Sequence, residues 1–437
     1  MRKINILFFC LALGFCSCKK ETPADYPSVQ ITSPYSLATF NVPGSIQVTG
    51  TVSDSKTLTS VNVYIANSQN LAVEQTIQVP VTSNNMNISL SYALNDIHMG
   101  SGSYYMTITA SNGTNVASAF KQIFIDAVQT KREVVYAITR NAAGVHAWGI
   151  DSVFQVSPAY SFSVPGDYSS SDVNSYYQQL YIAAHDSGNV NIYGVPNVSP
   201  EWNITGNPSP EPFFTNVYCN QDAEYVSFYG ASNATVKCYN HAGIIQGVYN
   251  VTAGYYPIKT FISAGWLFAE EKSISSSLEN LALFYAGTGG SYVQAGLPGP
   301  VTAIYAQDNN DVFVFGNNST GGGYIKQYNI PGNTFYSPAF SLSSYGQLLS
   351  AAQINENTYL ISFGNGTIYQ YTYNPVSITP LINGISASTV RYDSISNQLL
   401  TASGKIVSEY TYSGLPALIN SVTLSDSVRD LRVLYNK

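Results

Sequence analysis

The stretch LYIAAHDSGNVNIYGV, residues 180–195, contains the pattern that decides the fold of most of this 437-residue chain. An apolar run, Leu180–Ala184, leads into a turn with Gly188 and Asn189, and Val190 and Tyr193 follow three residues apart. Two apolar segments joined by a short turn with Gly and Asn are typical of a β-hairpin. The stretch therefore predicts two antiparallel strands.

The same pattern recurs along the chain after Arg132, and its aromatic residues are 39 to 46 residues apart. The apolar and aromatic pairs are Val145 and Trp148, Val190 and Tyr193, Val236 and Tyr239, Leu281 and Phe284, Ile325 and Tyr328, Ile368 and Tyr371, and Val407 and Tyr410. Repeats of this length with several strands each are those of β-propeller blades. The sequence therefore predicts seven blades, with these aromatic side chains packed between them.

A further short strand precedes each apolar strand except in the first copy, which directly follows a linker. The last ten residues, Val428–Lys437, form an apolar strand that can complete the first blade and so leave no open edge. We therefore expect residues 133–437 to be a seven-bladed β-propeller closed by the C-terminal strand. The stretch at 180–195 resembles the YVTN-type propellers of bacterial envelope proteins, and this resemblance implies a fold rather than an activity.

Residues 27–127 contain seven short segments in which apolar and polar residues alternate, such as Ile46–Val52 and Tyr104–Ile108. Seven such strands in about 100 residues are typical of a β-sandwich. The motifs ITSP at 31–34, VTGTVSDSKTLTSVNVYI at 48–65 and GSYYMTITASNG at 102–113 resemble the immunoglobulin-like modules of bacterial surface proteins. The whole chain is thus expected to be all-β, with an Ig-like sandwich that serves as a spacer before the propeller.

The N-terminus begins with Arg2 and Lys3 and continues with an apolar run, Ile4–Phe15, which is too short to span a membrane. The small residue Ser17 before Cys18 resembles the lipobox of bacterial lipoproteins. That resemblance implies a signal peptide at 1–17, a lipid anchor on Cys18, a tether at 18–26 and a place at the outer membrane or cell surface. Phe15 and Cys16 depart from the usual Leu and Ala or Ser of the lipobox, so secretion without a lipid stays an alternative.

Three short motifs in the sequence share the pattern Asp-Ser followed by Val or Ile. They resemble the O-glycosylation acceptor of exported Bacteroidetes proteins, and they are Asp151-Ser152-Val153, Asp393-Ser394-Ile395 and Asp426-Ser427-Val428. The resemblance implies that glycans are attached at these motifs and, together with the lipobox-like Ser17-Cys18, a Bacteroidetes-like lipoprotein.

Charge is sparse in this sequence, because charged residues make up 10% of the chain and the net charge is −7. From Cys18 onward the chain has 16 bases and 25 acids, and no run of Lys or Arg interrupts them. A basic patch is what nucleic-acid binding requires, so no nucleic-acid partner is expected. A chain with so few charged residues is also expected to attract charged partners only weakly.

Cys219 and Cys238 are the cysteines that remain beyond the N-terminal segment. They fall on the first and third predicted strands of one blade, where strands lie about 9.5 Å apart. Bridged cysteines need Cα atoms within about 7 Å. Two buried thiols are the simpler expectation, although an oxidising compartment keeps a disulfide open as the alternative.

No motif for catalysis, for a cofactor or for a metal stands out. The four histidines, at positions 98, 146, 185 and 241, lack the spacing of metal ligands. Neither a Gly-x-Ser-x-Gly elbow nor a phosphate loop nor a His-Glu-x-x-His motif is present. The charged group Glu270-Glu271-Lys272 is expected to form a solvated turn.

Tyrosines in the predicted connections between blades are the candidate binding residues: Tyr168, Tyr255, Tyr256 and Tyr345. Loops on a rigid scaffold are common binding sites, and aromatic rings can stack on sugars. The sequence therefore favours a non-enzymatic envelope protein whose propeller binds or scaffolds a protein or a polysaccharide. Two alternatives stay open: a propeller enzyme acting on glycans, marked by carboxylates that converge at the channel mouth, and a structural or adhesion protein of the surface.

Overall fold

The computed structural model describes residues 25–185, 188–206, 213–221, 223–228, 234–286, 291–336 and 340–437. The predicted signal peptide and the lipidation candidate Cys18 lie outside these ranges. The chain divides into two compact units, Met1–Gln129 and Thr130–Lys437. The regular secondary structure of the described residues consists of strands and of two short 3₁₀ turns, Pro158–Tyr160 (η2) and Ser343–Tyr345 (η3).

The first unit is a sandwich of two sheets, in which β1, β3 and β6 form one sheet and β2, β8, β7, β4 and β5 form the other. Its strands are β1 Ser28–Ser33, β2 Ala38–Asn41, β3 Gly44–Ser53, β4 Ser60–Ala66, β5 Ile77–Val79, β6 Asn85–Leu94, β7 Gly102–Ser111 and β8 Val116–Asp126. The seven strands expected from the alternating pattern are present. The short β2, which pairs in parallel with β8, was not expected.

Alternation places one side of each strand in the core of this unit. In β3 the side chains of Ile46, Val48 and Val52 are buried, whereas Gln47 and Thr51 between them are exposed. Gly50 shares the buried side, and a Cβ atom there would lie 2.3 Å from the Gln30 carbonyl oxygen of β1. A glycine is therefore required at this position for β1 and β3 to pair.

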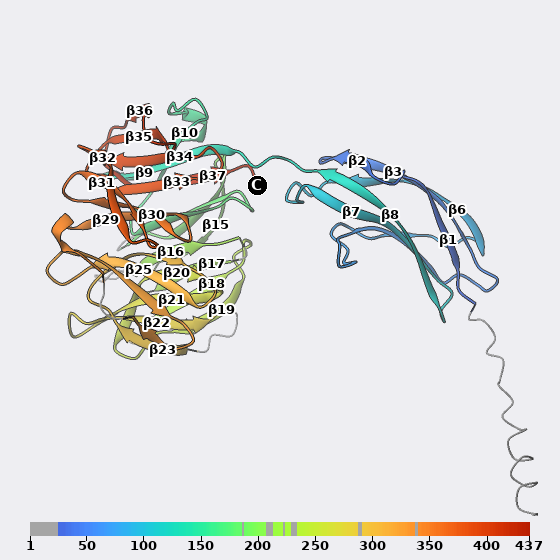
Figure 1. Ribbon diagram of the computed structural model, residues 1–437, viewed down its shortest axis with the longest axis horizontal. Coiled ribbons are helices and arrows are strands. Elements are labelled where there is room, and N and C mark those ends of the chain that lie inside the picture. The colour runs from blue at the N-terminus through green and yellow to red at the C-terminus, as the bar shows by residue number, and fades with distance from the viewer. Residues whose placement is uncertain are drawn as a thin grey trace, which may run out of the picture. The chain divides into compact units, whose positions relative to one another are not determined.

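The second unit contains, among its described residues, seven antiparallel sheets. Strands of these sheets, among them β9, β16 and β37, are labelled in Figure 1. One strand of each sheet contacts the corresponding strand of the next, in the order β12, β16, β20, β24, β29, β33, β37 and back to β12. We call these the inner strands. They are β12 Ser170–Asn174, β16 Phe214–Cys219, β20 Tyr255–Ser263, β24 Val301–Ala306, β29 Leu348–Asn355, β33 Thr389–Asp393 and β37 Val428–Tyr435.

The second strand of each sheet is the most deeply buried and contains the apolar run of the repeat. These strands are β9 Arg132–Asn141, β13 Gln179–Ala183, β17 Glu224–Phe228, β21 Trp266–Ser273, β25 Asp311–Asn317, β30 Thr358–Phe363 and β34 Gln398–Ser403. The third strands are β10 Gly144–Ile150, β14 Val190–Gly194, β18 Thr235–Tyr239, β22 Glu279–Tyr285, β26 Gly323–Asn329, β31 Thr367–Thr372 and β35 Ile406–Thr411. The outer strands are β11 Phe162–Val164, β15 Ser199–Ile204, β19 Ile245–Asn250, β23 Ser291–Gly296, β27 Thr334–Phe335 with β28 Phe340–Leu342, β32 Ser377–Asn383 and β36 Leu418–Thr423.

This succession of seven sheets, six of four strands and one of five, each facing the next, is the architecture of a β-propeller. The repeated aromatic residues all lie on third strands, where five are buried and Trp148 and Tyr193 are half-buried. They pack with residues of neighbouring sheets; Phe284 of β22, for example, shares a cluster with Tyr225 of β17 and Val236 of β18. The aromatic repeat in the sequence is thus a packing feature.

The last strand of the chain belongs to the same sheet as the first strand of this unit. β37 pairs antiparallel with β9, with Leu431 opposite Ala137 and Leu434 opposite Val134. Beyond the strand, the Lys131 backbone N–H donates to Asn436 Oδ1 at 2.8 Å. The sheet order is consequently β11, β10, β9, β37, with β37 as its inner strand.

Two expectations about individual residues can be compared with the structure directly. Cys219 and Cys238 are both free and buried, so the simpler expectation of two thiols holds. The expectation that Glu270-Glu271-Lys272 forms a solvated turn was wrong. These residues lie within β21, and both glutamates are fully buried, because their carboxylates accept backbone N–H groups: Val301 N–H on Glu270 and Thr252 N–H on Glu271.

Candidate functional site

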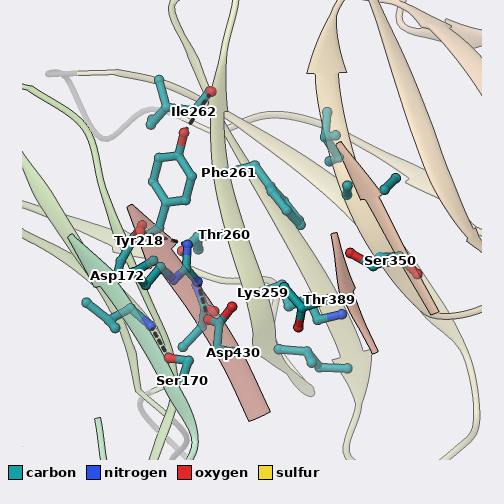
Figure 2. Close-up of a pocket in the computed structure, with 18 of the residues that line it drawn as sticks. Ser170, Asp172, Tyr218, Lys259, Thr260, Phe261, Ile262, Ser350, Thr389 and Asp430 are labelled. Carbon is teal, nitrogen blue, oxygen red and sulfur yellow. Dashed lines mark hydrogen bonds and ion pairs between the residues drawn. The ribbon is translucent and has the colours of Figure 1, made fainter. Parts of the chain in front are cut away.

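A cavity of about 900 Å³ lies where the inner strands of the second unit face one another, and all seven inner strands contribute to its lining. Figure 2 shows the side chains that border it, from Ser170 and Asp172 to Ser350 and Thr389. Pockets for small ligands are commonly about 300–1,000 Å³. The cavity is therefore large enough for a small molecule or for a short segment of a polymer.

Three arginines from two neighbouring inner strands form one wall of this cavity: Arg391 of β33, and Arg429 and Arg432 of β37. The sequence contains no run of basic residues, yet the fold gathers these three bases and Lys259 around one cavity. The expectation of little attraction toward charged partners, which rests on the charge of the whole chain, stays a prediction.

Two carboxylates lie among the arginines and are held by them. Arg432 donates to Asp172 Oδ1 at 2.8 Å and to Asp430 Oδ2 at 2.6 Å, and Arg391 Nη2 donates to Asp430 Oδ1 at 2.9 Å. Backbone N–H groups complete the set, with Cys219 N–H on Asp172 at 2.7 Å and Leu431 N–H on Asp430 at 2.8 Å. Each of the four carboxylate oxygens thus accepts at least one hydrogen bond.

The ionisation of this cluster follows from burial and from the neighbouring charges. Burial raises the pKa of Asp172, although Arg432 and the backbone N–H groups oppose the change. Burial would lower the pKa of Arg432, but Asp172 and Asp430 outweigh it and raise that pKa. Arg432 therefore stays charged, and it holds β37 to β12 across the boundary between two sheets.

Arg429 differs from the other two arginines because it is exposed and makes no hydrogen bond or ion pair with the described residues. Lys259 of β20 is half-buried, and its Nζ donates to the Val301 carbonyl oxygen at 2.5 Å. No carboxylate lies within ion-pair distance of either group in the described part of the chain. Arg429 thus faces the cavity without a paired negative charge, whereas Lys259 lies opposite the buried Glu270 of β21 and opposes the rise in the pKa of that carboxyl.

Aromatic side chains contribute to the lining from the inner strands β16, β20 and β24. Tyr218 and Phe261 have ring centroids 6.4 Å apart, and Tyr305 follows on the next strand. The tyrosine hydroxyls are held in place, because Tyr218 donates to the Ile262 carbonyl oxygen at 3.3 Å and Tyr305 to that of Ala351 at 2.8 Å. Burial raises the pKa of both tyrosines, so their hydroxyls stay protonated.

Hydroxyl-bearing residues occupy further positions around the cavity, and some of them join one inner strand to the next. The Val217 N–H donates to Ser170 Oγ at 2.7 Å, and the Val390 N–H donates to Ser350 Oγ at 3.0 Å. Thr260 Oγ1 accepts a hydrogen bond from Asn216 Nδ2 at 3.0 Å. Thr302 also lines the cavity and is half-buried.

The tyrosines selected from the sequence do not form one site. Tyr168 lines the cavity, and its hydroxyl lies 3.0 Å from Ser171 Oγ. Tyr255 and Tyr256 are the first residues of β20 rather than a loop, and they are not among the lining residues. Tyr345 ends η3 and packs beside Tyr369 and Phe363, with ring centroids 4.9 and 5.5 Å away.

Sequence reasoning missed the charged lining residues. A signal was present in Arg429-Asp430-Leu431-Arg432, where three charges share four residues of a chain in which charges are few. Arg391 and Lys259 are single bases in their strands, and only the fold brings them to the same cavity.

The described residues offer no metal centre, because no three His, Cys, Asp or Glu side chains gather as metal ligands there. In the same ranges, no helix is long and apolar enough to cross a bilayer. The serines of the three Asp-Ser-Val/Ile motifs, Ser152, Ser394 and Ser427, are all exposed.

Comparison with known proteins identifies the first unit. Residues 27–115 match the bacterial Ig domain family, so the sandwich is an Ig-like domain. No curated protein is matched by the chain.

Several solved structures are similar to the chain at low identity. A quinonprotein alcohol dehydrogenase-like protein from Bacteroides thetaiotaomicron is 10% identical with a TM-score of 0.46, covering 94% of this chain and 99% of that one. Apo AztD from Citrobacter koseri is 8% identical with a TM-score of 0.48, covering 69% and 98%. The β-propeller domain of Cps50 (Swd1) from Myceliophteria thermophila is 10% identical with a TM-score of 0.46, covering 61% and 90%. Similarities this distant say nothing about activity.

Proposed function

We propose that the chain is a non-enzymatic, lipid-anchored protein of the bacterial cell envelope, and that its second unit is a seven-bladed β-propeller that binds a ligand in its central cavity. The observation behind this proposal is the cavity of about 900 Å³ lined by all seven inner strands. A rigid ring of strands fixes the positions of its lining side chains, and a ligand site benefits from that rigidity.

Closure of the propeller by its own C-terminal strand is part of the proposal. It is supported by the pairing of β37 with β9 and by the contacts of β37 with both β33 and β12. A closed ring has no unpaired inner edge, and it brings Arg429 and Arg432 of the last strand to the cavity.

Export and anchoring are supported by the N-terminal sequence, with its basic start, its short apolar run and the lipobox-like Ser17-Cys18. The Ig-like domain then acts as a spacer between the anchored end and the propeller. We place the protein at the outer membrane or the cell surface, with a Bacteroidetes-like origin.

A glycan-processing enzyme is the competing proposal, because Asp172 and Asp430 do converge on the cavity. Glycosidases need one carboxyl group free to protonate the leaving oxygen and another free to attack or to activate water. Here the oxygens of both residues are occupied by guanidinium and backbone N–H groups. The arrangement therefore favours binding without turnover.

A purely structural or adhesive role would be favoured if the selected tyrosines were all buried. Tyr168, Tyr255, Tyr256 and Tyr345 are each half-buried. The cavity gives the binding proposal a specific site, which the structural role lacks.

The test is a glycan array probed with the full chain and with Thr302→Trp, whose indole would fill part of the cavity. Thr423→Trp is the matched control, since Thr423 is exposed on the outer strand β36 and away from the cavity. We expect glycans that bind the wild type and the control but lose at least tenfold in affinity for Thr302→Trp. Binding that is unaffected by Thr302→Trp would overturn the cavity as the site, and release of reducing ends from any glycan would overturn the non-enzymatic role.

A further inference from the structure

The charge of the cavity lining is opposite to that of the chain as a whole. Four bases, Lys259, Arg391, Arg429 and Arg432, face two acids, Asp172 and Asp430, whereas the chain has 18 bases and 25 acids. The two acids are already paired with Arg391 and Arg432. The surplus positive charge of the lining therefore belongs to Arg429, which has no acidic partner among the described residues, and to Lys259, whose charge is partly offset by Glu270 behind the lining.

These two bases come from opposite sides of the ring of inner strands. In the order of contacts, β20, which contains Lys259, is three places from β37, which contains Arg429. A guanidinium group binds carboxylate and sulfate through two parallel hydrogen bonds, and an ammonium group binds them as a point charge. The cavity can thus attract an anionic ligand at either side.

Aromatic rings and hydroxyl groups occupy the space between the two bases. Tyr218, Phe261 and Tyr305 offer ring surface, and the half-buried Thr302 offers a hydroxyl. An aromatic ring packs well against the flat, apolar face of a pyranose, while threonine hydroxyls exchange hydrogen bonds with sugar hydroxyls. A simple inorganic anion would leave these groups without a use.

We infer that the cavity binds a short acidic oligosaccharide, with its carboxylate or sulfate groups at Arg429 and Lys259 and a sugar ring against Phe261 or Tyr218. This inference rests on the proposed function, because it names the ligand class of the same cavity. The volume of about 900 Å³ suits a few sugar units rather than a folded protein partner.

The experiment measures binding by calorimetry with the full chain and two acidic probes: tetragalacturonate and a chondroitin sulfate tetrasaccharide. The matched neutral probes are the methyl ester of the first and the desulfated, esterified form of the second. We expect at least one acidic probe to bind, to lose affinity as salt rises, and to bind at least tenfold more tightly than its neutral form.

Variants of the two bases then test whether their positive charges bind the acidic probe. Arg429→Gln and Lys259→Gln should each weaken the acidic probe at least tenfold, and Arg429→Lys should retain part of the affinity. Arg140→Gln is the control, because Arg140 is an exposed arginine of β9 outside the cavity and its removal changes the net charge equally. Arg429 is itself exposed and unpaired among the described residues, so Arg429→Gln should unfold at the wild-type denaturant concentration.

Several results would overturn the inference. Neutral probes that bind as tightly as acidic ones, or acidic probes that bind Arg429→Gln and Lys259→Gln as they bind the wild type, would exclude an acidic ligand at these bases. Failure of both acidic probes to bind would do the same. The proposed function fails separately, when Thr302→Trp leaves the binding of every array ligand unchanged.

Discussion

Glu270 shows how a single buried side chain couples the fold to pH. Its Oε1 accepts the Val301 N–H at 2.9 Å, while Oε2 is buried with no hydrogen-bond partner among the described residues. Burial raises the pKa of Glu270 to about 7, against the opposing effect of Lys259 and of the Val301 hydrogen bond. The folded protein therefore holds a proton on this residue that the unfolded chain releases near pH 4.5.

Replacing Glu270 with glutamine should remove this dependence on pH. Because the pKa is raised on folding, the contribution of Glu270 to stability is favourable below about pH 4.5 and is lost as the pH rises through about 7. A shift of this size corresponds to about 3 kcal/mol. We expect Glu270→Gln, whose amide oxygen can still accept the Val301 N–H, to be more stable than the wild type at pH 8 by up to about that amount. The two should be similar near pH 4.5.

Urea unfolding at pH 4.5, 6 and 8 measures this difference, with Glu356→Gln at an exposed turn as the control. Tryptophan fluorescence reports on the propeller unit alone, since the three tryptophans of the chain, at 148, 202 and 266, all lie in it. A stability gap between Glu270→Gln and the wild type that stays constant with pH would contradict the account.

Arg132 is a second residue whose removal has a defined cost. It pairs with Asp393 and Glu409 of the neighbouring sheet, whose side chains are 0% and 2% exposed, and donates to Gln398 at 3.1 Å. Arg132→Met would leave two buried carboxylates without their cation, and the free energy of unfolding should fall by about 3–5 kcal/mol. Arg140→Met, on the exposed end of the same strand, should change it by less than about 0.5 kcal/mol. Equal losses for the two variants in urea titrations would show that the pairing stabilises nothing.

At the scale of elements, the strands were easier to predict than the site. The apolar runs on second strands and the aromatics on third strands follow directly from packing, which repeats from sheet to sheet. The short β2 escaped prediction because its pairing with β8 is parallel and distant in sequence, and neither feature leaves a local pattern. Glu270 and Glu271 were expected to be solvated because charged side chains usually are. Their burial depends on the backbone N–H groups of Val301, which begins β24, and of Thr252, which precedes β20, and no local pattern around the glutamates reveals these donors.

The cavity lining could not be derived from the sequence either, because its charged residues come from strands that lie far apart in the chain. Lys259, Arg391 and Asp172 are isolated charges on strands that are separated by long stretches of chain. Their meeting depends on the order in which inner strands contact one another, which no local spacing encodes. Among the selected tyrosines, Tyr168 alone lines the cavity, although Tyr255 and Tyr256 belong to the inner strand β20, so a place at or near an inner strand does not by itself predict the lining.

β37 is the element whose packing is most open to test. Leu431 and Leu434 are both fully buried, Leu431 with Leu400 and Val407 on one side and Leu434 with Leu180 and Ile182 on the other. Leu431→Ala and Leu434→Ala should each lower the free energy of unfolding by about 2–5 kcal/mol. Leu418→Ala, on the exposed face of β36, should lower it by less than about 1 kcal/mol.

Unfolding curves followed by tryptophan fluorescence distinguish these variants. Losses confined to Leu431→Ala would mean that β37 packs on one neighbour only. Losses in neither variant would contradict the proposal that this strand closes the ring.

At the scale of the whole molecule, the proposed anchor gives a further prediction. If Cys18 receives a lipid, the wild-type protein made in bacteria should partition into the detergent phase of a Triton X-114 extract. Cys18→Ala should move it to the aqueous phase, because a covalent lipid contributes about 0.8 kcal/mol per buried CH₂ group to membrane binding. Ser55→Ala, an exposed change within the Ig-like domain, is the control. Cys18→Ala protein that stays in the detergent phase would refute lipidation at this residue.

The pairing of the last strand with the first has a consequence for biosynthesis. A chain leaves the ribosome from its N-terminus, so β9 emerges long before its partner β37. Until Val428–Tyr435 arrive, one edge of β9 stays bare and can pair with a neighbouring nascent chain. The sheet of β9 is therefore complete only after β37 has been synthesised, and the interval before it is when chaperones have most to protect.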